Sequence, residues 1–321
     1  MNRIVLSTTL SLAAFTPFAM RGQDLPDNPN RLSLGPTFGL NFKADFHNNV
    51  NSGTYDDGYV LKDSSTPPDG FASYWRYQNA SQYNAANGGS MQFHAIQDSS
   101  SATDNPQYGA ELIYQRVIGS LPFMSGDWGL EAGFGFTELD LRENLSGNGL
   151  VIMDSYPLNG VLPPDAGYNG PFSGASYLLG DTPTRSTTSA ALTGYQKLSG
   201  QLFSLRLGPF AEWKFTSKLS LAASVGLTLA PAMVDYDFSE TAVVTSDGAV
   251  ISASGHSSKT KLLYGPYVGA MLRYDFDKCW GVYVGARFQN LTDLNQSIGS
   301  RTARLDPGAT VYATAGISWK F

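Results

Sequence analysis

The chain has a single cysteine, few charged residues and no long hydrophobic run beyond residues 1–22. Cys279 has no partner for an internal disulfide, so the fold must be stable without cross-links. Charged residues make up 15% of the chain and the formal net charge is −6, which argues against a nucleic-acid partner. No later segment holds the roughly 18 consecutive apolar residues that a membrane-spanning helix needs. The sequence has no P-loop or paired cysteines, and we expect no cofactor and no metal ion.

The N-terminus has the layout of a secretory signal peptide. A positive start at residues 1–3 precedes an apolar stretch at residues 4–20, and the chain then turns abruptly polar. This order predicts a signal peptide over residues 1–22, followed by a short polar segment over residues 23–30. A membrane anchor helix is the alternative, but it is disfavoured because the stretch is short and contains Pro17.

The last residues, 308–321, alternate between apolar and polar side chains and end on Phe321. With a side-chain period of two, Ile317, Trp319 and Phe321 share one apolar face, which needs a core or lipid. A final strand of this kind resembles the last strand of bacterial outer-membrane β-barrels. The resemblance implies that Trp319 and Phe321 belong to the signal that the barrel-assembly machinery recognises.

Seven further segments alternate in the same way, at residues 32–42, 108–119, 127–141, 203–215, 219–229, 262–276 and 280–289. Together they predict an all-β fold, a transmembrane antiparallel up-and-down β-barrel of eight strands over residues 31–321. The low mean hydropathy of −0.16 is consistent with such a barrel, because the apolar residues that face lipid alternate with polar residues along each strand. Residues 71–77 and 90–96 leave ten strands open as the alternative, although we favour a hairpin within a loop.

The links between these segments alternate in length. Three are short, and four are long, near residues 47–107, 143–199, 235–258 and 291–307. Residues 149–153 could form a strand, but the Pro, Gly and Ser content around them favours a loop. Outer-membrane barrels combine short periplasmic turns with long extracellular loops. We therefore expect the cell outer membrane of a Gram-negative-type bacterium as the location, with both termini and residues 23–30 periplasmic.

Charged side chains fall on the face opposite to the apolar one. They should point into the barrel, because Arg or Lys facing lipid at mid-depth costs about 2 to 4 kcal/mol. An eight-stranded barrel is only wide enough inside for side chains, so charges of mixed sign should pair there. The pattern resembles the small barrels of the OmpA transmembrane-domain and OmpX type, which implies a filled lumen. The predicted interior charge network comprises Glu111, Glu131, Arg206, Glu212, Arg273, Asp275 and Arg287.

The first long loop is rich in aromatic and amide side chains that we expect to be exposed. Such side chains combine stacking with hydrogen bonding and suit surface glycans or protein partners. Cross-strand packing within a protruding hairpin is the simpler interpretation. The set comprises Tyr55, Tyr59, Tyr74, Trp75, Tyr77, Asn79, Gln82, Tyr83 and Asn84.

Two groups of loop residues could carry chemistry. His256, Ser258 and Glu240 could act as base, nucleophile and acid of a lipid-modifying enzyme, but a serine-rich stretch supplies His-x-Ser easily by chance. For the second group we favour solvated residues over a metal site; it comprises His47, His94, Asp56, Asp57 and Asp98.

The sequence therefore predicts a non-enzymatic, monomeric outer-membrane β-barrel with a structural or adhesive function. Its expected surroundings are outer-membrane lipid and lipopolysaccharide. A narrow passive channel is the alternative, and a lipid-modifying enzyme is the third hypothesis.

Overall fold

The structure is a computed structural model that describes residues 28–48, 50, 53–61, 69–72, 74–103, 106–121, 125–160, 162–171, 179–245 and 248–321. The predicted signal peptide, residues 1–22, lies outside the described residues. Within the described residues, no helix is long and apolar enough to cross a membrane.

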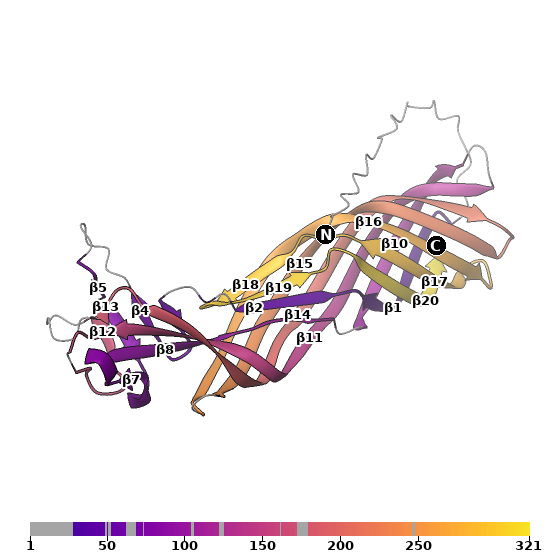
Figure 1. The fold of residues 1–321 in the computed structure, drawn as a ribbon. Coiled ribbons are helices and arrows are strands. Elements are labelled where there is room, and N and C mark those ends of the chain that lie inside the picture. The colour runs from indigo at the N-terminus through magenta and orange to yellow at the C-terminus, as the bar shows by residue number, and fades with distance from the viewer. Residues whose placement is uncertain are drawn as a thin grey trace, which may run out of the picture.

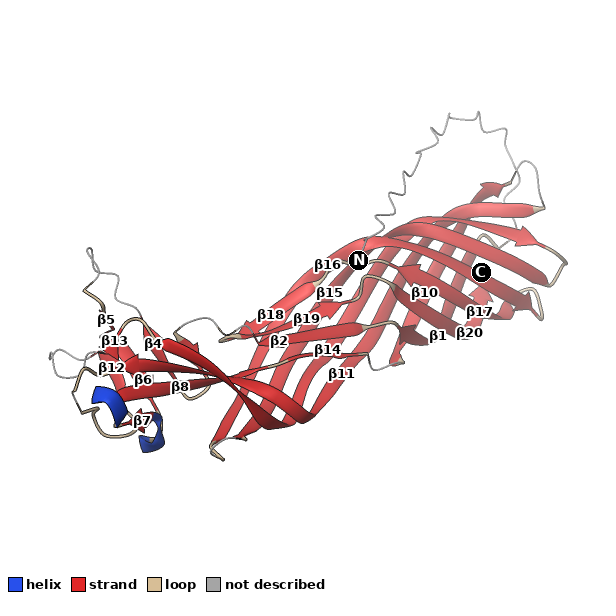
Figure 2. Cartoon of the chain, in the orientation of Figure 1, coloured by secondary structure: helices blue, strands red, loops and turns tan. Residues whose placement is uncertain are grey.

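Eight antiparallel strands close into a barrel (Figures 1 and 2). Each strand pairs with the next around the ring, and β20 pairs with β1 while β10 pairs with both β1 and β11. In ring order the strands are β1 (Asn30–Leu40), β10 (Gln107–Ser120), β11 (Gly126–Pro157), β14 (Thr184–Lys214), β15 (Leu219–Val244), β16 (Val250–Asp275), β17 (Trp280–Gln289) and β20 (Thr310–Lys320). The predicted eight-stranded barrel is confirmed. The ten-stranded alternative is wrong for the described chain, because residues 71–77 and 90–96 lie outside the ring.

The wall of the barrel continues far beyond the shortest strands. β11 and β14 have 32 and 31 residues, whereas β1 and β20 have 11 each. Beyond the short strands, on the side away from the short turns, lies a second sheet. Its strand order is β18 (Leu294–Ile298), β19 (Arg301–Asp306), β2 (Lys43–Asn48) and β9 (Ser99–Ala102). These four strands directly follow β17 and β1 or directly precede β20 and β10 in the chain. They therefore extend the wall of the barrel on the side of its short strands, in the direction away from the short turns.

A separate unit, which we call the head, lies at the far end of the long hairpins (Figure 1). It consists of the described residues of 53–97 and 150–180. β8 (Ser90–Gln97) attaches it by pairing with the end of β11. Its other elements are β3 (Thr54–Tyr55), β4 (Gly58–Leu61), β5 (Phe71–Ala72), β6 (Tyr74–Tyr77), β7 (Tyr83–Asn84), β12 (Asn169–Pro171), β13 (Leu179–Gly180) and the short 3₁₀ helices η1 (Ala80–Gln82) and η2 (Ala86–Gly88).

Two sequence predictions about strands in the loops are wrong. Residues 149–153 lie within β11 and not in an irregular loop. Residues 71–77 and 90–96 do not pair as one hairpin, because β6 pairs with β4 and β12 whereas β8 pairs with β11 and β7. The extended edge of the long β11–β14 hairpin offers β8 a partner that is distant in sequence.

The expected exposure of the aromatic side chains in the first long loop is also wrong in part. Trp75 and Tyr77 are 0% and 2% exposed, and Tyr55 is 7% exposed. They pack with Phe93 and Tyr156 in a core that belongs to the head alone. Burial of large aromatic side chains supplies much of the stability of a small unit, so these three members of the set serve the fold of the head.

The polarity of the inner and outer faces of the wall inverts between the lower half of the barrel, near the short turns, and the upper half, toward the head. In the lower half of β15, Leu227 is exposed on the outside and the polar Thr228 is buried inside. In the upper half of the same strand, Tyr236 is buried inside and Asp237 lies outside. The lower half is therefore built for lipid, and the upper half has the apolar interior and polar exterior of a barrel surrounded by water.

Candidate functional site

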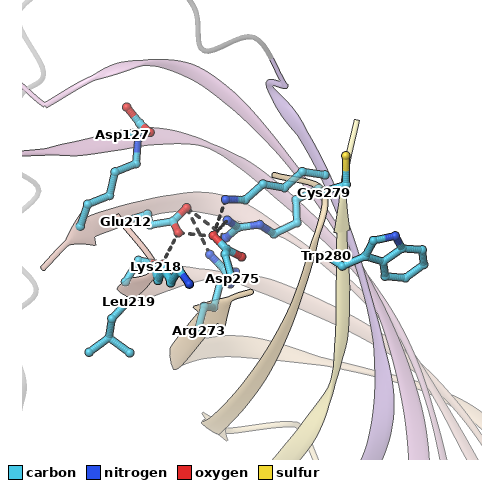
Figure 3. A network of polar contacts seen from close by, with 12 residues as sticks. Asp127, Glu212, Lys218, Leu219, Arg273, Asp275, Cys279 and Trp280 are labelled. Atoms are coloured by element: carbon cyan, nitrogen blue, oxygen red, sulfur yellow. Dashed lines mark hydrogen bonds and ion pairs between the residues drawn. The ribbon is translucent and has the colours of Figure 1, made fainter. Parts of the chain in front are cut away.

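A cluster of charged side chains fills the interior near the short turns (Figure 3). Arg31 donates hydrogen bonds of 2.9 and 3.2 Å to Glu212, and a guanidinium nitrogen of Arg273 lies 3.4 Å from the same carboxylate. Asp275 lies 3.5 Å from Arg31 and also pairs with Lys320. Arg273 is fully buried, so these groups must compensate one another away from water.

A second charged cluster lies farther from the turns. The carboxylate of Glu111 pairs with Arg206 at 2.8 Å and also with Arg287. The exposed fractions of the three side chains are 1%, 3% and 6%. Gly133 makes room for this cluster, because a Cβ atom there would lie 2.7 Å from the guanidinium of Arg206. One carboxylate therefore balances two buried guanidinium groups.

All seven residues of the predicted interior network are buried. Glu131 is the one without an ion pair among the described residues; it accepts hydrogen bonds from Gln115 at 2.7 Å and from Tyr267 at 3.4 Å. Sequence analysis missed Arg31. The signal was present, because Arg31 shares its face of β1 with the buried Ser33.

A packed apolar layer fills the lumen above the two charged clusters. Phe42 and Tyr312 meet edge to face with ring centroids 6.0 Å apart, and Phe46 stacks on Tyr236 at 5.8 Å. Interiors packed in this way contain few voids as large as a water molecule. The layer comprises Phe42, Ala44, Phe46, Ala102, Leu139, Leu141, Leu198, Leu202, Ala230, Ala232, Val234, Tyr236, Phe238, Leu263, Leu291, Leu294, Ala303, Leu305 and Tyr312.

The outside of the lower barrel carries a belt of exposed apolar side chains. On β11 the belt runs over residues 128–136, which spans about 20 to 25 Å at about 3.4 Å per residue and a strand tilt of about 40°. Aromatic pairs mark its edges: Trp280 with Trp319 near the turns, and Phe38 with Tyr108 at the opposite edge. Outer-membrane barrels have an apolar band about 25 Å tall between two aromatic girdles. The described chain therefore has the fold and the apolar belt that are typical of outer-membrane β-barrels.

No protein-family model matches this chain, and no curated protein matches its sequence. Among solved structures, the outer membrane protease OmpT from Escherichia coli is 12% identical, covers 92% of this chain and 97% of its own, and gives a TM-score of 0.36. OprG from Pseudomonas aeruginosa is 10% identical over 92% of this chain and 97% of its own, with a TM-score of 0.33. Ail of Yersinia pestis, solved with the heparin analogue sucrose octasulfate, is 12% identical over 91% and 99%, with a TM-score of 0.28. Similarities of this size carry no argument about function.

An Asp–His–Ser chain of hydrogen bonds lies on the outer wall of the β15–β16 hairpin. Nδ1 of His256 is 2.7 Å from Oδ1 of Asp237, and Nε2 is 3.3 Å from Oγ of Ser258. The hydrogen bond with Asp237 raises the pKa of His256 above its usual value. The acid considered in the sequence, Glu240, does not join this chain. It is buried inside the barrel wall, because residues 237 and 240 lie on opposite faces of the strand.

Arg301 ties the head to the upper barrel. Its guanidinium pairs with Asp56, between β3 and β4 of the head, and lies 2.6 Å from the carboxylate of Glu240 on β15. It also lies over the ring of Phe238, 4.4 Å from the centroid. Burial raises the pKa of Glu240 and the nearby Asp56 adds to this effect, whereas Arg301 opposes it.

A buried carboxylate organises the core of the head. Asp154 accepts hydrogen bonds of 2.8 and 2.7 Å from Arg185 and of 2.6 Å from the hydroxyl of Tyr55. Burial disfavours the charged form, but these donors outweigh it and hold the pKa of Asp154 below its usual value. On the surface of the head, Tyr59 and Tyr74 stack with centroids 5.7 Å apart.

The histidines and aspartates of the first loop have separate partners. Nδ1 of His94 lies 2.7 Å from Asp57, and Nδ1 of His47 lies 3.1 Å from the hydroxyl of Ser99. Asp98 lies 3.4 Å from the amide nitrogen of Gln196. In the part of the chain that the structure describes, no three metal-ligating side chains gather into one group.

The C-terminal residues lie at the rim with the short turns (Figure 1). The rings of Trp319 and Phe321 stack with centroids 4.6 Å apart. Phe321 and Asn30 exchange two backbone hydrogen bonds, which joins the end of the chain to the start of β1. That Trp319 and Phe321 act as an assembly signal stays a prediction.

Proposed function

We propose that the protein is a non-conducting anchor in the outer membrane that holds a folded head outside the cell, with a structural or adhesive function. The observation that carries this proposal is the filled lumen beneath a head with its own core. Two charged clusters and a packed apolar layer follow one another along the barrel axis. The short turns and the C-terminus face the periplasm in this proposal, because short turns are periplasmic in such barrels.

The length of the hairpins supports the same function. Beyond the apolar belt, β11 continues over residues 137–157, which extends about 70 Å along the strand at about 3.4 Å per residue. The ion pairs of Arg301 with Asp56 and Glu240 fix the head to this extension. A head held rigidly at this distance is accessible to other molecules above the lipid headgroups.

Conductance in planar bilayers tests the filled lumen. We expect the purified protein to insert without opening steady channels, because ions would have to cross the packed apolar layer. Steady single-channel currents from the folded protein would favour the passive channel and overturn the anchor.

The adhesive function of the head is tested by replacing two tyrosines on its surface. Cells that present the Tyr59→Ser, Tyr74→Ser double variant should adhere less to a surface of immobilised glycans or matrix protein than cells with the unaltered protein. Tyr195→Ser, on the outer wall of β14, is the matched control. Equal adhesion of all three would leave a structural role and remove the adhesive one.

A second candidate function is hydrolysis of esters at Ser258, and the hydrogen-bond chain through His256 to Asp237 favours it. In this reaction the Ser258 oxygen would attack the ester carbonyl while His256 takes the hydroxyl proton and then passes it to the leaving alkoxide. Water would release the acyl group by the same route. A fluorophosphonate probe should then label the protein but not Ser258→Ala, with Ser254→Ala as the control; equal labelling of all forms, or none, would remove this candidate.

A further inference from the structure

One face of a small sheet in the head is open to solvent in the described chain. The sheet has the strand order β12, β6, β4 and β3, and its other face carries Val60, Trp75 and Tyr77 into the core of the head. Side chains that alternate with these residues lie on the open face. Among them, Tyr74 and Leu61 are 38% and 49% exposed. The open face therefore presents large apolar side chains on a folded support.

Two tyrosines on this face form a pair that is ordered before any ligand arrives. The rings of Tyr59 on β4 and Tyr74 on β6 stack with centroids 5.7 Å apart and an interplanar angle of 21°. The hydroxyl of Tyr59 donates a hydrogen bond of 2.7 Å to Oδ1 of Asn169 on β12, which holds the first ring in place. Side chains that are fixed in this way lose little conformational freedom on binding. Tyr74 therefore offers a rigid surface against which the apolar side of a sugar ring can stack.

Hydrogen-bond donors lie next to the tyrosine pair. In the register of the sheet, Arg76 lies opposite Tyr59 on one side and opposite Asn169 on the other. Arg76 is exposed, and within the described chain its guanidinium forms no ion pair. Tyr59 occupies the amide oxygen of Asn169, whereas the amide nitrogen donates to no other group of the described chain. The unused polar groups of this row are therefore donors, which suit a carboxylate.

The charge around Arg76 favours an acidic ligand, although the net charge of the chain is −6. The two acidic residues in the turn between β3 and β4 are already engaged, because Asp56 pairs with Arg301 and Asp57 accepts hydrogen bonds from His94. Carboxylates farther away are screened, since the Debye length is about 8 Å at physiological ionic strength. A ligand on the open face therefore meets the positive charge of Arg76.

The size of the face distinguishes a sugar from a protein as the ligand. Three strand spacings of about 4.8 Å make the face about 14 Å wide, and the four residues of β4 or β6 span about 10 Å. The resulting area of roughly 140 Å² accommodates about two or three sugar rings. A stable protein interface needs about 800 Å² on each partner. The face is therefore large enough for a short stretch of polysaccharide and too small for a stable protein interface.

We propose that this face binds an acidic polysaccharide built of hexuronic acids. The carboxylate of one sugar pairs with Arg76, a sugar ring stacks on Tyr74, and the amide nitrogen of Asn169 donates to a sugar hydroxyl. A guanidinium matches a planar carboxylate because it donates two parallel hydrogen bonds to it. This inference rests on the adhesive function proposed above and names the chemical class of its partner.

Calorimetric titration of the folded full-length protein in detergent tests the site, with tetragalacturonic acid as the probe. We expect saturable binding at one site per chain. Arg76→Gln removes the charged contact and Tyr74→Ser removes the stacking contact, and each should weaken binding about tenfold or more. Arg142→Gln, which changes an exposed arginine on the outer wall of β11, is the matched control and should bind as the unaltered protein does. Unchanged binding in Arg76→Gln, or an equal loss in Arg142→Gln, would overturn the proposal.

A second comparison needs no variant and so does not depend on the folding of one. The fully methyl-esterified tetramer has the same sugar rings without the charges, and we expect it to bind about tenfold more weakly or worse. Equal binding of the acid and the ester would overturn the proposal, as would binding of neither.

The adhesion assay separates this inference from the proposed function. If the Tyr59→Ser, Tyr74→Ser cells lose adhesion but the unaltered protein does not bind tetragalacturonic acid, the adhesive function stands and the acidic polysaccharide is excluded. Adhesion to a matrix protein that is unchanged after enzymatic removal of its acidic sugars would likewise point to a protein partner and overturn this inference alone. Bilayer conductance, which tests the anchor, is independent of these outcomes.

Discussion

Replacing Glu111 by glutamine is the sharpest test of the filled barrel. The substitution keeps the size of the side chain and one acceptor oxygen, but it removes the charge and replaces the second acceptor oxygen by an NH₂ donor. Arg206 and Arg287 both pair with this carboxylate, and all three groups are almost completely buried. The variant would therefore leave two guanidinium groups side by side without the carboxylate that balances them.

The expected loss of stability follows from the geometry. At 2.8 Å and an effective dielectric constant of about 20, the gross attraction between Glu111 and Arg206 is about 6 kcal/mol. The desolvation cost of the charged groups offsets part of this attraction. Breaking a buried ion pair by removing one partner costs about 3 to 5 kcal/mol, and we expect Glu111→Gln to lower the free energy of unfolding by that amount.

Urea denaturation of the protein folded in lipid vesicles measures the effect. Glu138→Gln is the matched control, because Glu138 lies exposed on the outer face of β11; it should change the free energy of unfolding by less than about 0.5 kcal/mol. If the lumen were filled with water, the charges would be screened. A loss below about 1 kcal/mol for Glu111→Gln would refute the filled-barrel reasoning.

Three further results are expected. Unheated protein in SDS should migrate faster than boiled protein, because a closed ladder has no edge from which to unzip, and identical migration would contradict the closed barrel. Deletion of Phe321 should reduce the amount of protein assembled in the membrane far more than the stability of protein already folded; an unchanged membrane yield would contradict its role in assembly. The lowered pKa of Asp154 contributes stability above the unfolded carboxyl value of about 3.9, and this contribution is lost as the pH falls through the lower folded value. Amide hydrogen exchange of β8, corrected for its intrinsic rate, should therefore rise below about pH 4, and an Asp154→Asn variant should lack this dependence.

The sequence by itself determined the barrel and the side of each strand that faces lipid. Alternation with period two is a local property, so it can be read from one strand at a time, and the order of short and long links gave the up-and-down connection. The same alternation placed the seven interior charges on the inner face. It would also have found Arg31, which shares that face with Ser33.

The tertiary structure decided everything that depends on which distant segments meet. The run from Glu138 to Leu141 continues the alternation without a break, but the apolar side now faces inward, because the strand has left the lipid. No single strand reveals where the surrounding solvent changes. The choice of Asp237 over Glu240 as the partner of His256 likewise depends on the register of β15 against β16. The head forms because β8 pairs with the end of β11, a contact between segments that lie far apart in the sequence, and local patterns carry no information about such pairings.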